Sequence, residues 1–291
     1  MILISLVTVN YNHSSLTLDL MRSLNALNEK GFELIIVDNG SKSPFQTDLQ
    51  MNYPYKVIHA GKNLGFAGGN ELGMSVASGE FLYLINNDTE IHNSFVEPIV
   101  QCFRNQPNLG MLSTLIRFYD SGLLQYAGAS ELSKITLRNF SIGFGEKDSS
   151  KYRGFAATGF IHGASMIIPK RIYEEIGGMW SPYFLYYEEY DWCARVKRAG
   201  YQIGVLGDVE VLHKESASVG QMSPLKIQYM TRNRILFARR NVRNWWPITL
   251  VYLTFFVSTR DILKYTFQSQ FNLIGPVIKG VFSGWTYKTS S

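Results

Sequence analysis

The sequence predicts an α/β fold: a mixed, mostly parallel sheet flanked by helices, followed by a helical C-terminal extension. Three observations lead to this prediction. Short apolar runs rich in β-branched residues alternate with helical patterns between Ile2 and Ile85, which is typical of parallel sheets covered on both faces. A second block of strand and helix patterns lies between Ile161 and Leu212. From Leu225 onward the pattern is helical, at first basic and then apolar.

The expected elements follow from hydrophobic period and from turn and capping residues. Strands are expected at Ile2–Val9, Glu33–Val37, Tyr55–His59, Phe81–Ile85, Ile161–Ile168, Gln202–Val205 and Val209–Leu212. Helices are expected from Ser14 or Ser15 to about Asn28, and at Phe66–Val76, Lys170–Ile176 and Tyr187–Ala199. The segment from about Gln106 to Arg153 reads as loop-rich.

Composition narrows the classes of protein. The chain has 291 residues, a net charge of +5 and only two cysteines, Cys102 and Cys193, which form no CxxC pair. This argues against a disulfide scaffold and a cysteine-built metal site, and it fits a reducing compartment. The basic balance favours anionic partners such as nucleotide diphosphates or acidic lipid. Nucleic acid is not an expected partner, because no recognisable nucleic-acid module surrounds the basic residues.

Carboxylates follow two of the expected strands. Asp38 comes directly after Glu33–Val37, and Asp88 follows Phe81–Ile85 after two asparagines. Ligands of such sheets bind beyond the carboxyl ends of the strands, where an Asp commonly accepts a hydrogen bond from a base or a ribose. A carboxylate flanked by amides can also hold the Mg²⁺ or Mn²⁺ that neutralises a leaving pyrophosphate. For each Asp the alternative is an ordinary polar turn.

A glycine-rich segment, Lys62-Asn-Leu-Gly-Phe-Ala-Gly-Gly-Asn70, leads into an expected helix. It offers exposed N–H groups, a helix N-terminus and a lysine, which suit a diphosphate. The segment matches neither the dinucleotide-binding GxGxxG pattern nor a Walker loop, so by itself it is a weak signal.

Three carboxylates in four residues, Glu188-Glu189-Tyr190-Asp191, open the helix Tyr187–Ala199. Such a group can supply the general base that activates an acceptor hydroxyl. The alternatives are a favourable charge at a helix N-terminus and an ion pair between Asp191 and Arg195, four residues later. His213, after the strand Val209–Leu212, is a natural further metal ligand, although a lone His is more often a surface or core side chain.

The order of these motifs resembles glycosyltransferase family 2, the inverting enzymes with the GT-A fold, and within it the bacterial rhamnosyltransferase-like and galactofuranosyltransferase-like branch. The resemblance covers about residues 1–240. It is carried by Val7-Thr-Val-Asn-Tyr-Asn12, Ile36-Val-Asp-Asn-Gly-Ser41, Asn63-Leu-Gly-Phe-Ala-Gly-Gly-Asn70, Leu84-Ile-Asn-Asn-Asp-Thr89, His162-Gly-Ala-Ser-Met-Ile-Ile168, Gly177-Gly178, Phe184-Leu-Tyr-Tyr-Glu-Glu-Tyr-Asp-Trp192 and His213.

The resemblance implies a catalytic domain over residues 1–224, with a donor-binding half of about 1–105 and an acceptor and base half of about 106–224, before a C-terminal region of 225–291. Asp38 would read the nucleotide base, and Asp88 and His213 would hold the metal. Glu189 stands where the family has its catalytic base, normally Asp, and Asp191 is the rival. The other donor-binding residues that the resemblance implies are Thr8, Asn10, Asn63, Gly65, Asn70 and Asn87.

The sequence departs from the family pattern in three places. Asn86 and Asn87 leave Asp88 as the only carboxylate of the metal motif, Glu189 replaces Asp, and Met179-Trp-Ser181 replaces an acidic pair that often follows Gly-Gly.

The function implied is transfer of a sugar, with rhamnose a candidate, from a dTDP- or UDP-sugar to a hydroxyl of a glycan or polyprenyl-linked glycan in bacterial polysaccharide synthesis. The main alternative is a catalytically impaired protein that keeps the fold as a carbohydrate-binding scaffold, as the replaced carboxylates would suggest. A nucleotidyltransferase is a third class, but its glycine-rich basic signature is missing near the N-terminus.

The C-terminal region combines positive charge with apolar surface. Between Lys226 and Arg243 there are six Lys or Arg and no acidic residue, and Trp245 and Trp246 open the apolar stretch that follows. This stretch, about 13 residues long, is shorter than the roughly 20 that a spanning helix needs, and no secretory signal opens the chain. We therefore expect a cytoplasmic protein held peripherally at the inner face of the plasma membrane. The alternative is a helix packed on the catalytic domain, with a homodimer contact.

Overall fold

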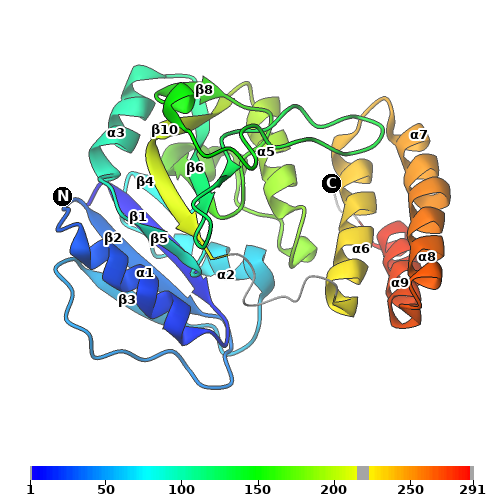
Figure 1. The fold of residues 1–291 in the computed structure, drawn as a ribbon, viewed down its shortest axis with the longest axis horizontal. Helices are drawn as coiled ribbons and strands as arrows, with labels where there is room; N and C mark the ends of the chain where they lie inside the picture. Colours follow the sequence, from blue (N-terminus) through cyan, green and yellow to red (C-terminus); the bar gives the residue numbers. More distant parts are fainter. Residues whose placement is uncertain (1, 215–222, 289–291) are drawn as a thin grey trace.

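A computed structural model of the chain describes residues 2–214 and 223–288 (Figure 1). Its centre is a ten-stranded sheet with the order β3-β2-β1-β4-β9-β6-β10-β5, while β7 pairs with β6 and β8 with β10. Strands β3, β2, β1 and β4 are parallel. Strand β9 runs antiparallel between β4 and β6, and β10 is parallel to β6. The expected mixed, mostly parallel sheet with flanking helices is therefore confirmed.

The elements have the following bounds. The strands are β1 Ile4–Asn10, β2 Phe32–Asp38, β3 Tyr55–His59, β4 Phe81–Ile85, β5 Thr89–Ile91, β6 Leu109–Phe118, β7 Leu124–Tyr126, β8 Phe155–Ala157, β9 Ser165–Pro169 and β10 Gln202–His213. The helices of the sheet region are α1 Ser14–Ala26, α2 Gly65–Met74, α3 Val96–Asn105, α4 Lys170–Ile176 and α5 Glu188–Arg198, with 3₁₀ turns at Ser150–Tyr152 and Ser181–Tyr183.

The sheet is buried on both faces because alternate side chains of its strands enter two different cores. On one face, Ile4 and Leu6 of β1 pack with Leu20 and Leu24 of α1, and α3 covers the same side. On the other face, Val7 of β1 packs with residues of α2, α4 and α5. This explains why the first strands read as continuous apolar runs instead of an alternating pattern.

The interpretation of residues 106–153 as loop-rich is wrong in part, since β6 is a ten-residue strand next to the middle of the sheet. Its first eight residues are buried, but Gly110, Ser113 and Thr114 interrupt the apolar pattern that would identify a strand. The two strands expected between Gln202 and Leu212 form one strand, β10, with a register irregularity between Leu206 and Glu210. The expected strand Ile161–Ile168 begins only at Ser165.

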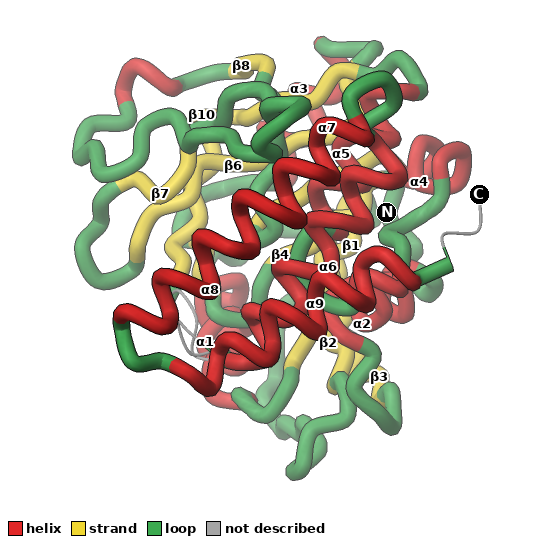
Figure 2. Tube along the Cα trace, turned by 90° about the vertical axis from the view of Figure 1, so that its right-hand side faces the viewer, coloured by secondary structure: helices red, strands yellow, loops and turns green. Residues whose placement is uncertain are grey.

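The C-terminal helices pack beside the sheet region (Figures 1 and 2). They are α6 Pro224–Asn241, α7 Trp246–Val251, a π-helical segment Tyr252–Val257, α8 Ser258–Phe267, a 3₁₀ turn Phe271–Leu273 and α9 Ile274–Thr286. The expected region 225–291 is described except for 289–291. Within the described ranges, no helix has both the length and the apolar character needed to cross a bilayer.

Helix α9 approaches α6 closely because it presents two glycines. A Cβ added to Gly280 would lie 2.7 Å from the Cβ of Thr231, and one added to Gly284 would lie 2.9 Å from the Cβ of Ile235. The guanidinium of Arg239 on α6 donates to the backbone carbonyls of Gly284, Trp285 and Tyr287 at the end of α9. The helices of this region therefore form a tightly packed unit rather than a loose tail.

Candidate active site

A cavity of about 360 Å³ lies at the carboxyl ends of the strands. Five of the residues that the sequence singled out line it: Asn63, Gly65, Asn87, Asp88 and His213. Further polar side chains that line it are Tyr11, Asn39, Asn86, Gln125, His162, Tyr186 and Lys226. The cavity is where ligands of an open α/β sheet are expected to bind.

Asp88 and His213 meet in this cavity, although 125 positions separate them in the chain. His213 Nε2 lies 3.3 Å from Asp88 Oδ1, and both side chains are largely buried. The antiparallel pairing of β5 with β10 produces this contact, because His213 is the register partner of Thr89, the residue after Asp88. The backbone N–H of Lys214 also donates to the carbonyl of Asp88, at 2.8 Å.

Gln125 of β7 orients His213 from the other side of the ring. Its Oε1 lies 2.8 Å from His213 Nδ1. If Nδ1 carries the proton and donates to this amide oxygen, the lone pair of Nε2 points toward Asp88 and the cavity. Gln125 is 8% exposed, and sequence reasoning missed it because β7 lies in the segment that read as loop.

His162 is a third imidazole beside this pair, with its ring centre 6.1 Å from that of His213. Burial lowers the pKa of His162 to about 3, helped by the neighbouring His213 and opposed by Asp88. The ring is therefore neutral at pH 7. Its Nδ1 accepts from the backbone N–H of Ala164 at 3.1 Å, which leaves Nε2–H as the donor. His162 belongs to one of the stretches that resemble the family, but the resemblance implies no role for it.

A second cavity of about 370 Å³ adjoins the first. Five residues line both cavities and form a common wall: Phe66, Asn86, His162, Leu185 and Tyr186. The carboxylates of Glu188 and Glu189 line the second cavity, together with the ring of Tyr190. Two ligands, one bound in each cavity, would therefore lie next to each other at these shared residues.

Glu188 and Glu189 carry unusual proton affinities. Burial raises the pKa of Glu189 to about 7, against the lowering effect of backbone hydrogen bonds. Burial and the adjacent Glu189 together raise the pKa of Glu188 well above its ordinary value. Among the described residues, Oε2 of each Glu is buried without a hydrogen-bond partner. A carboxylate with a pKa near 7 is suited to take up a proton at neutral pH.

Asp191 has different surroundings, although it is only two residues further along α5. Its side chain is fully buried, with Oδ2 2.9 Å from Arg195 Nε and Oδ1 3.3 Å from Arg240 Nε. The Asn241 side chain also donates to Oδ1, at 2.8 Å. Asp191 lines neither cavity. The ion pair between Asp191 and Arg195, which the sequence offered as an alternative, is present within α5. The contacts of Asp191 with Arg240 and Asn241 tie α5 to α6.

The turn before α5 has a strained backbone that α6 holds in place. Phe184, Tyr186 and Tyr187 have φ values of 64°, 69° and 75°, which non-glycine residues rarely adopt. Asn233 of α6 is fully buried, and its amide donates to the carbonyls of Tyr183, Leu185 and Tyr186 at 2.7–2.9 Å. These bonds fix the turn that leads directly into Glu188 and Glu189. No sequence motif identified Asn233.

A buried hydrogen-bond chain joins the ends of β4, β1 and β2. Asn87 Nδ2 donates to Thr17 Oγ1 at 3.1 Å, Thr17 donates to Asn10 at 2.9 Å, and Asn10 donates to Asp38 at 3.0 Å. Burial tends to raise the pKa of Asp38, but hydrogen bonds from Ser41, Asn10 and His59 outweigh it and hold the pKa below its ordinary value. Asp38 is therefore ionised at pH 7.

Four predicted donor-binding residues lie behind the cavity instead of lining it: Thr8, Asn10, Asp38 and Asn70. Asn70 donates to the carbonyl of Phe66 within its own helix, at 2.9 Å. Thr8 is fully buried, and its hydroxyl has no hydrogen-bond partner within the described ranges. Asn39, which the sequence reasoning did not select, lines the cavity in the position that follows Asp38.

The expectation that the glycine-rich segment offers exposed N–H groups is wrong for the start of α2. The N–H of Leu64 donates to Asn39, that of Gly65 to Asn63, and that of Phe66 to the carbonyl of Phe184. Gly65 has a φ of 74°, and a Cβ there would clash with Phe184. The glycine is thus needed for close packing against the strained turn. Lys226 of α6, rather than the exposed Lys62, supplies a cation to the cavity.

The side chains at the first cavity fit a divalent cation in part. A carboxylate oxygen and an imidazole nitrogen converge there, and both are suitable ligands for Mn²⁺ or Mg²⁺. Over residues 2–214 and 223–288, no group of three His, Cys, Asp or Glu side chains is arranged to hold a metal ion. A cation at Asp88 and His213 would therefore need further oxygen ligands from phosphate or water, as Mg²⁺ commonly has beside a nucleotide.

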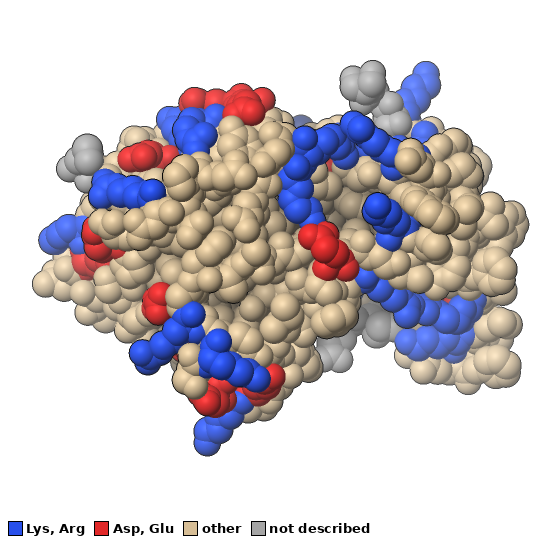
Figure 3. Space-filling view, turned by 90° about the horizontal axis from the view of Figure 1, so that it is seen from above, with Lys and Arg blue, Asp and Glu red and all other residues tan. Residues whose placement is uncertain are grey.

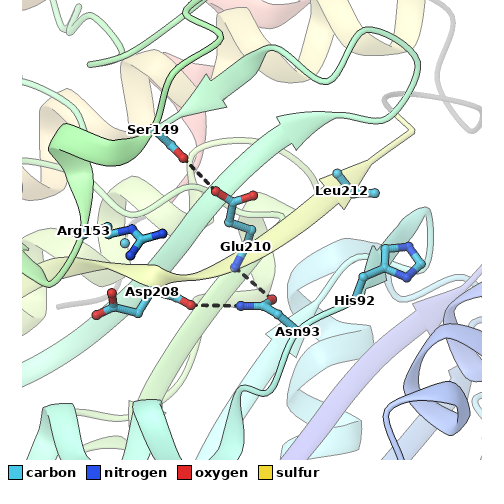
Figure 4. Close-up of a pocket in the computed structure, with 8 residues that line it drawn as sticks. His92, Asn93, Ser149, Arg153, Asp208, Glu210 and Leu212 are labelled. Atoms are coloured by element: carbon cyan, nitrogen blue, oxygen red, sulfur yellow. Dashed lines mark hydrogen bonds between the residues drawn. The ribbon is translucent and has the colours of Figure 1, made fainter.

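Another cavity, of about 610 Å³, lies at the bulged part of β10 (Figure 4). Its polar groups mostly bind one another: Ser149 donates to Glu210, and Asn93 links the carbonyl of Asp208 to the N–H of Glu210. Glu210 also pairs with Arg117, at 2.9 Å. The cavity is larger than the two at the strand ends. The carboxylate of Glu210 is already paired with Arg117, so we assign this cavity no catalytic role.

Comparison with known proteins agrees with this geometry. The family described as glycosyl transferase family 2 matches residues 5–177. The chain is 23% identical to the low-salt glycan biosynthesis hexosyltransferase Agl10 of Haloferax volcanii, over 98% of this chain and 92% of the relative. It is 21% identical to the N-acetylglucosaminyl-diphospho-decaprenol L-rhamnosyltransferase of Mycobacterium tuberculosis, over 84% and 86%. It is 24% identical to the dTDP-rhamnosyl transferase RfbF of Shigella flexneri, over 81% and 79%.

Solved structures share the fold at low sequence identity. A mannosyltransferase of Pyrobaculum calidifontis, in complex with GDP-Man and Mn²⁺, aligns with a TM-score of 0.58 and 11% identity, over 97% of this chain and 87% of its own. Staphylococcus aureus TarS, in complex with UDP-GlcNAc, aligns with a TM-score of 0.59 and 15% identity, over 96% and 82%. The expected GT-A fold is thereby confirmed. The chain is a glycosyltransferase and belongs to glycosyl transferase family 2.

Proposed function

We propose that this protein transfers a sugar from a dTDP- or UDP-sugar to a hydroxyl of a glycan or polyprenyl-linked glycan, with inversion at the anomeric carbon. One observation carries the proposal: the cavity with Asp88 and His213 and the cavity with Glu189 share a wall. A donor in the first cavity and an acceptor in the second would bring the acceptor hydroxyl oxygen close to the anomeric carbon of the donor, which is the main requirement of a direct displacement.

In this proposal the donor diphosphate lies among Asp88, His213 and Lys226. Bound Mg²⁺ or Mn²⁺ would neutralise charge on the departing diphosphate, and the ammonium of Lys226 would add to that effect. Gln125 keeps the His213 ring oriented, and neutral His162 donates a hydrogen bond at the wall between the cavities. Asp38, with Asn10 and Asn39, supports the binding of the nucleotide base at the ends of β1 and β2.

Glu189 is the proposed catalytic base. As the acceptor oxygen forms its bond to the anomeric carbon, the bond from that carbon to the diphosphate oxygen breaks, and the acceptor proton moves to the Glu189 carboxylate. Inversion needs only this one base, opposite the leaving group. A pKa of about 7 supports the role, because a base works best when its pKa lies near the working pH. Asp191 is the weaker candidate, since two guanidinium groups neutralise its carboxylate.

Rhamnose is our candidate for the sugar, and a polyprenyl-linked glycan is our candidate for the acceptor. Two relatives carry rhamnosyl transfer in their names, one from dTDP-rhamnose and one to a diphospho-decaprenol acceptor. A lipid-linked acceptor would require the enzyme to work at the cytoplasmic face of the plasma membrane, in the synthesis of a cell-envelope polysaccharide.

The test is a donor panel of dTDP-rhamnose, UDP-galactose, UDP-galactofuranose, UDP-glucose and UDP-N-acetylglucosamine, assayed with Mg²⁺, with Mn²⁺ and with EDTA. We expect metal-dependent release of the nucleotide diphosphate from one donor, and NMR of the product should give the opposite anomeric configuration to the donor. Full activity in EDTA would contradict the metal role. A product that retains the donor configuration would contradict the mechanism.

A further inference from the structure

Exposed apolar side chains are concentrated in the C-terminal helices. Of twenty large hydrophobic side chains that are exposed among the described residues, twelve lie between Trp245 and Trp285. The most exposed of the twelve are Phe267 at 86% and Phe282 at 70%. Isolated exposed apolar residues are normal on a protein surface, but a group of this size on one unit marks an interaction site.

Five of the twelve belong to two helices that pack against each other, α8 and α9 (Figure 2). Helix α8 buries Tyr265 and Ser258 and exposes Leu263 and Phe267 on the opposite side. Helix α9 buries Val277, Gly280 and Gly284 against the protein. Its exposed side carries Ile278 and Phe282. We call the outward faces of α8 and α9 the α8–α9 surface.

Cations are interspersed with the apolar side chains on this surface. Arg260 and Lys264 share the exposed side of α8 with Leu263 and Phe267, because they follow the same helical period. On α9, Lys279 follows Ile278 and is exposed. The one nearby acidic residue, Asp261, pairs with Arg260 at 2.5 Å.

The charge of the C-terminal region contrasts with the rest of the chain. From Ser223 to Lys288 there are ten Lys or Arg and one acidic residue, whereas residues 1–222 contain eighteen basic and twenty-two acidic residues. In the view from above, the right-hand part of the molecule, which holds the C-terminal helices, carries blue side chains with little red (Figure 3). The partner of this surface is therefore expected to be both apolar and anionic.

The exposed side chains are not simply displaced from a loose core. Gly280 and Gly284 seat α9 against α6, and the indole N–H of Trp285 donates to Thr254 at 3.0 Å. The apolar residues on the inward sides of these helices, Tyr265, Leu273 and Val277, form a core of their own with Ile227 of α6. The outward side chains therefore stay exposed, because the inward sides of these helices are already packed.

Building on the proposed function, in which the acceptor is lipid-linked, we propose that the α8–α9 surface binds an anionic lipid bilayer. The two helices lie in the interfacial plane, with Phe267 and Phe282 among the acyl chains and Lys264 and Lys279 at the headgroups, as amphipathic helices do. A second copy of the chain is a poorer partner, because a symmetric contact would bring the same cations face to face.

The proposal is tested by sedimentation with vesicles of phosphatidylcholine alone and of phosphatidylcholine with phosphatidylglycerol, without donor or acceptor. We expect binding to the anionic vesicles, weakened by salt. The double variant F267S/F282S should bind at least tenfold more weakly, and K264Q/K279Q about thirtyfold more weakly, from the typical contribution of each basic side chain near an anionic surface. Phe144→Ser is the matched control, since Phe144 is 65% exposed in a loop outside these helices.

Unchanged binding in both double variants, or equal binding to neutral and anionic vesicles, would overturn the proposal. A wild-type dimer in light scattering that the F267S/F282S variant turns into a monomer, without vesicle binding, would assign the surface to a second copy instead. Because vesicle binding needs no sugar transfer, its failure would leave the proposed function standing. Conversely, a protein that binds vesicles but turns over no donor would contradict only the proposed function.

Discussion

The two sides of the active site are built in different ways. The donor side consists of side chains at the ends of neighbouring strands, and the chain Asn87–Thr17–Asn10–Asp38 is held almost entirely by β1, β2, β4 and α1. The acceptor side consists of a strained turn and the first residues of α5, held by Asn233 from about fifty positions downstream. The strand ends therefore supply most of the first side, whereas the second side depends on packing between distant segments.

This difference changes how the C-terminal region is understood. The division at residue 224 follows the sequence pattern, but α6 contributes Lys226 to the donor cavity, Asn233 to the strained turn and Arg240 to Asp191. Helix α9 in turn packs on α6 through Gly280 and Gly284. We therefore expect that deleting residues 245–291 would disturb the catalytic side as well as any lipid contact.

The largest effect is expected on the donor side. Asp88→Ala should reduce turnover at least about a thousandfold while leaving the fold intact, because it removes the carboxylate proposed to hold the metal against the diphosphate. A rate assay would measure the loss of turnover, and electron paramagnetic resonance would measure the loss of Mn²⁺ binding. Asp48→Ala, at an exposed carboxylate, is the control. If Asp88→Ala bound Mn²⁺ normally, the metal site would lie elsewhere.

The next prediction distinguishes the roles of Glu189 and Asp191 on α5. Glu189→Gln should lower kcat by a factor of about 10²–10⁴ with donor binding unchanged, because it removes the base. Asp191→Asn should instead lower the free energy of unfolding, by about 3 kcal/mol, since two arginines lose a buried charged partner. Rate measurements and urea unfolding on both variants would distinguish the roles. An inactive but fully stable Asp191→Asn protein would reverse the assignment.

Loss of the side chain that orients His213 should have a smaller effect on the donor side. Gln125→Leu should weaken Mn²⁺ affinity about 10–100-fold, as is typical when the partner of a ligating histidine is lost. Calorimetric titration of Mn²⁺ measures this without any sugar transfer. Gln125→Glu keeps an acceptor for His213 Nδ1 and should retain more of the affinity. Equal affinities in wild-type and Gln125→Leu proteins would show that Gln125 has no such role.

Loss of the contact between Asn233 and the strained turn should affect the acceptor side more than the donor side. Asn233→Ala leaves three carbonyls of the strained turn without their donor, so the free energy of unfolding should fall by about 1–3 kcal/mol. Because the turn positions Glu189, kcat should fall roughly tenfold, with little change in KM for the donor. Asn244→Ala, at an exposed position, serves as control. A change confined to donor KM would mean that α6 supports the donor side instead.

The smallest effect is the pH dependence. The folded protein holds the proton on Glu189 more tightly than a free glutamate does, so the basic form becomes abundant only as the pH rises to about 7. The rate should therefore fall about tenfold for each pH unit below this midpoint, and it should level off above it. A profile of kcat against pH would test this, with Asp191→Asn keeping the midpoint. A midpoint near the ordinary value for Glu would contradict the proposed environment.

Local pattern was sufficient for much of the fold. Strands Tyr55–His59 and Phe81–Ile85 and helix Lys170–Ile176 agree with the structure at both ends, since each has a clear apolar period between turn residues. Strand β6 was missed because its buried run contains Gly110, Ser113 and Thr114, which resemble loop residues. Gln125 was missed with it, because β7 lies in the same segment.

The sequence by itself determined the α/β class, the strand ends at which Asp38 and Asp88 stand, and the acidic start of α5. These features depend on residues close together in the chain, where hydrophobic period and turn chemistry act directly. Only the tertiary structure decided that His213 meets Asp88 through the β5–β10 register, and that Asn233 holds the strained turn. It also decided that Arg240 of α6 binds Asp191 while Glu189 lines a cavity. The physical reason is that strand order and helix packing bring these groups together across the chain, and no local pattern encodes which distant side chain will be the neighbour.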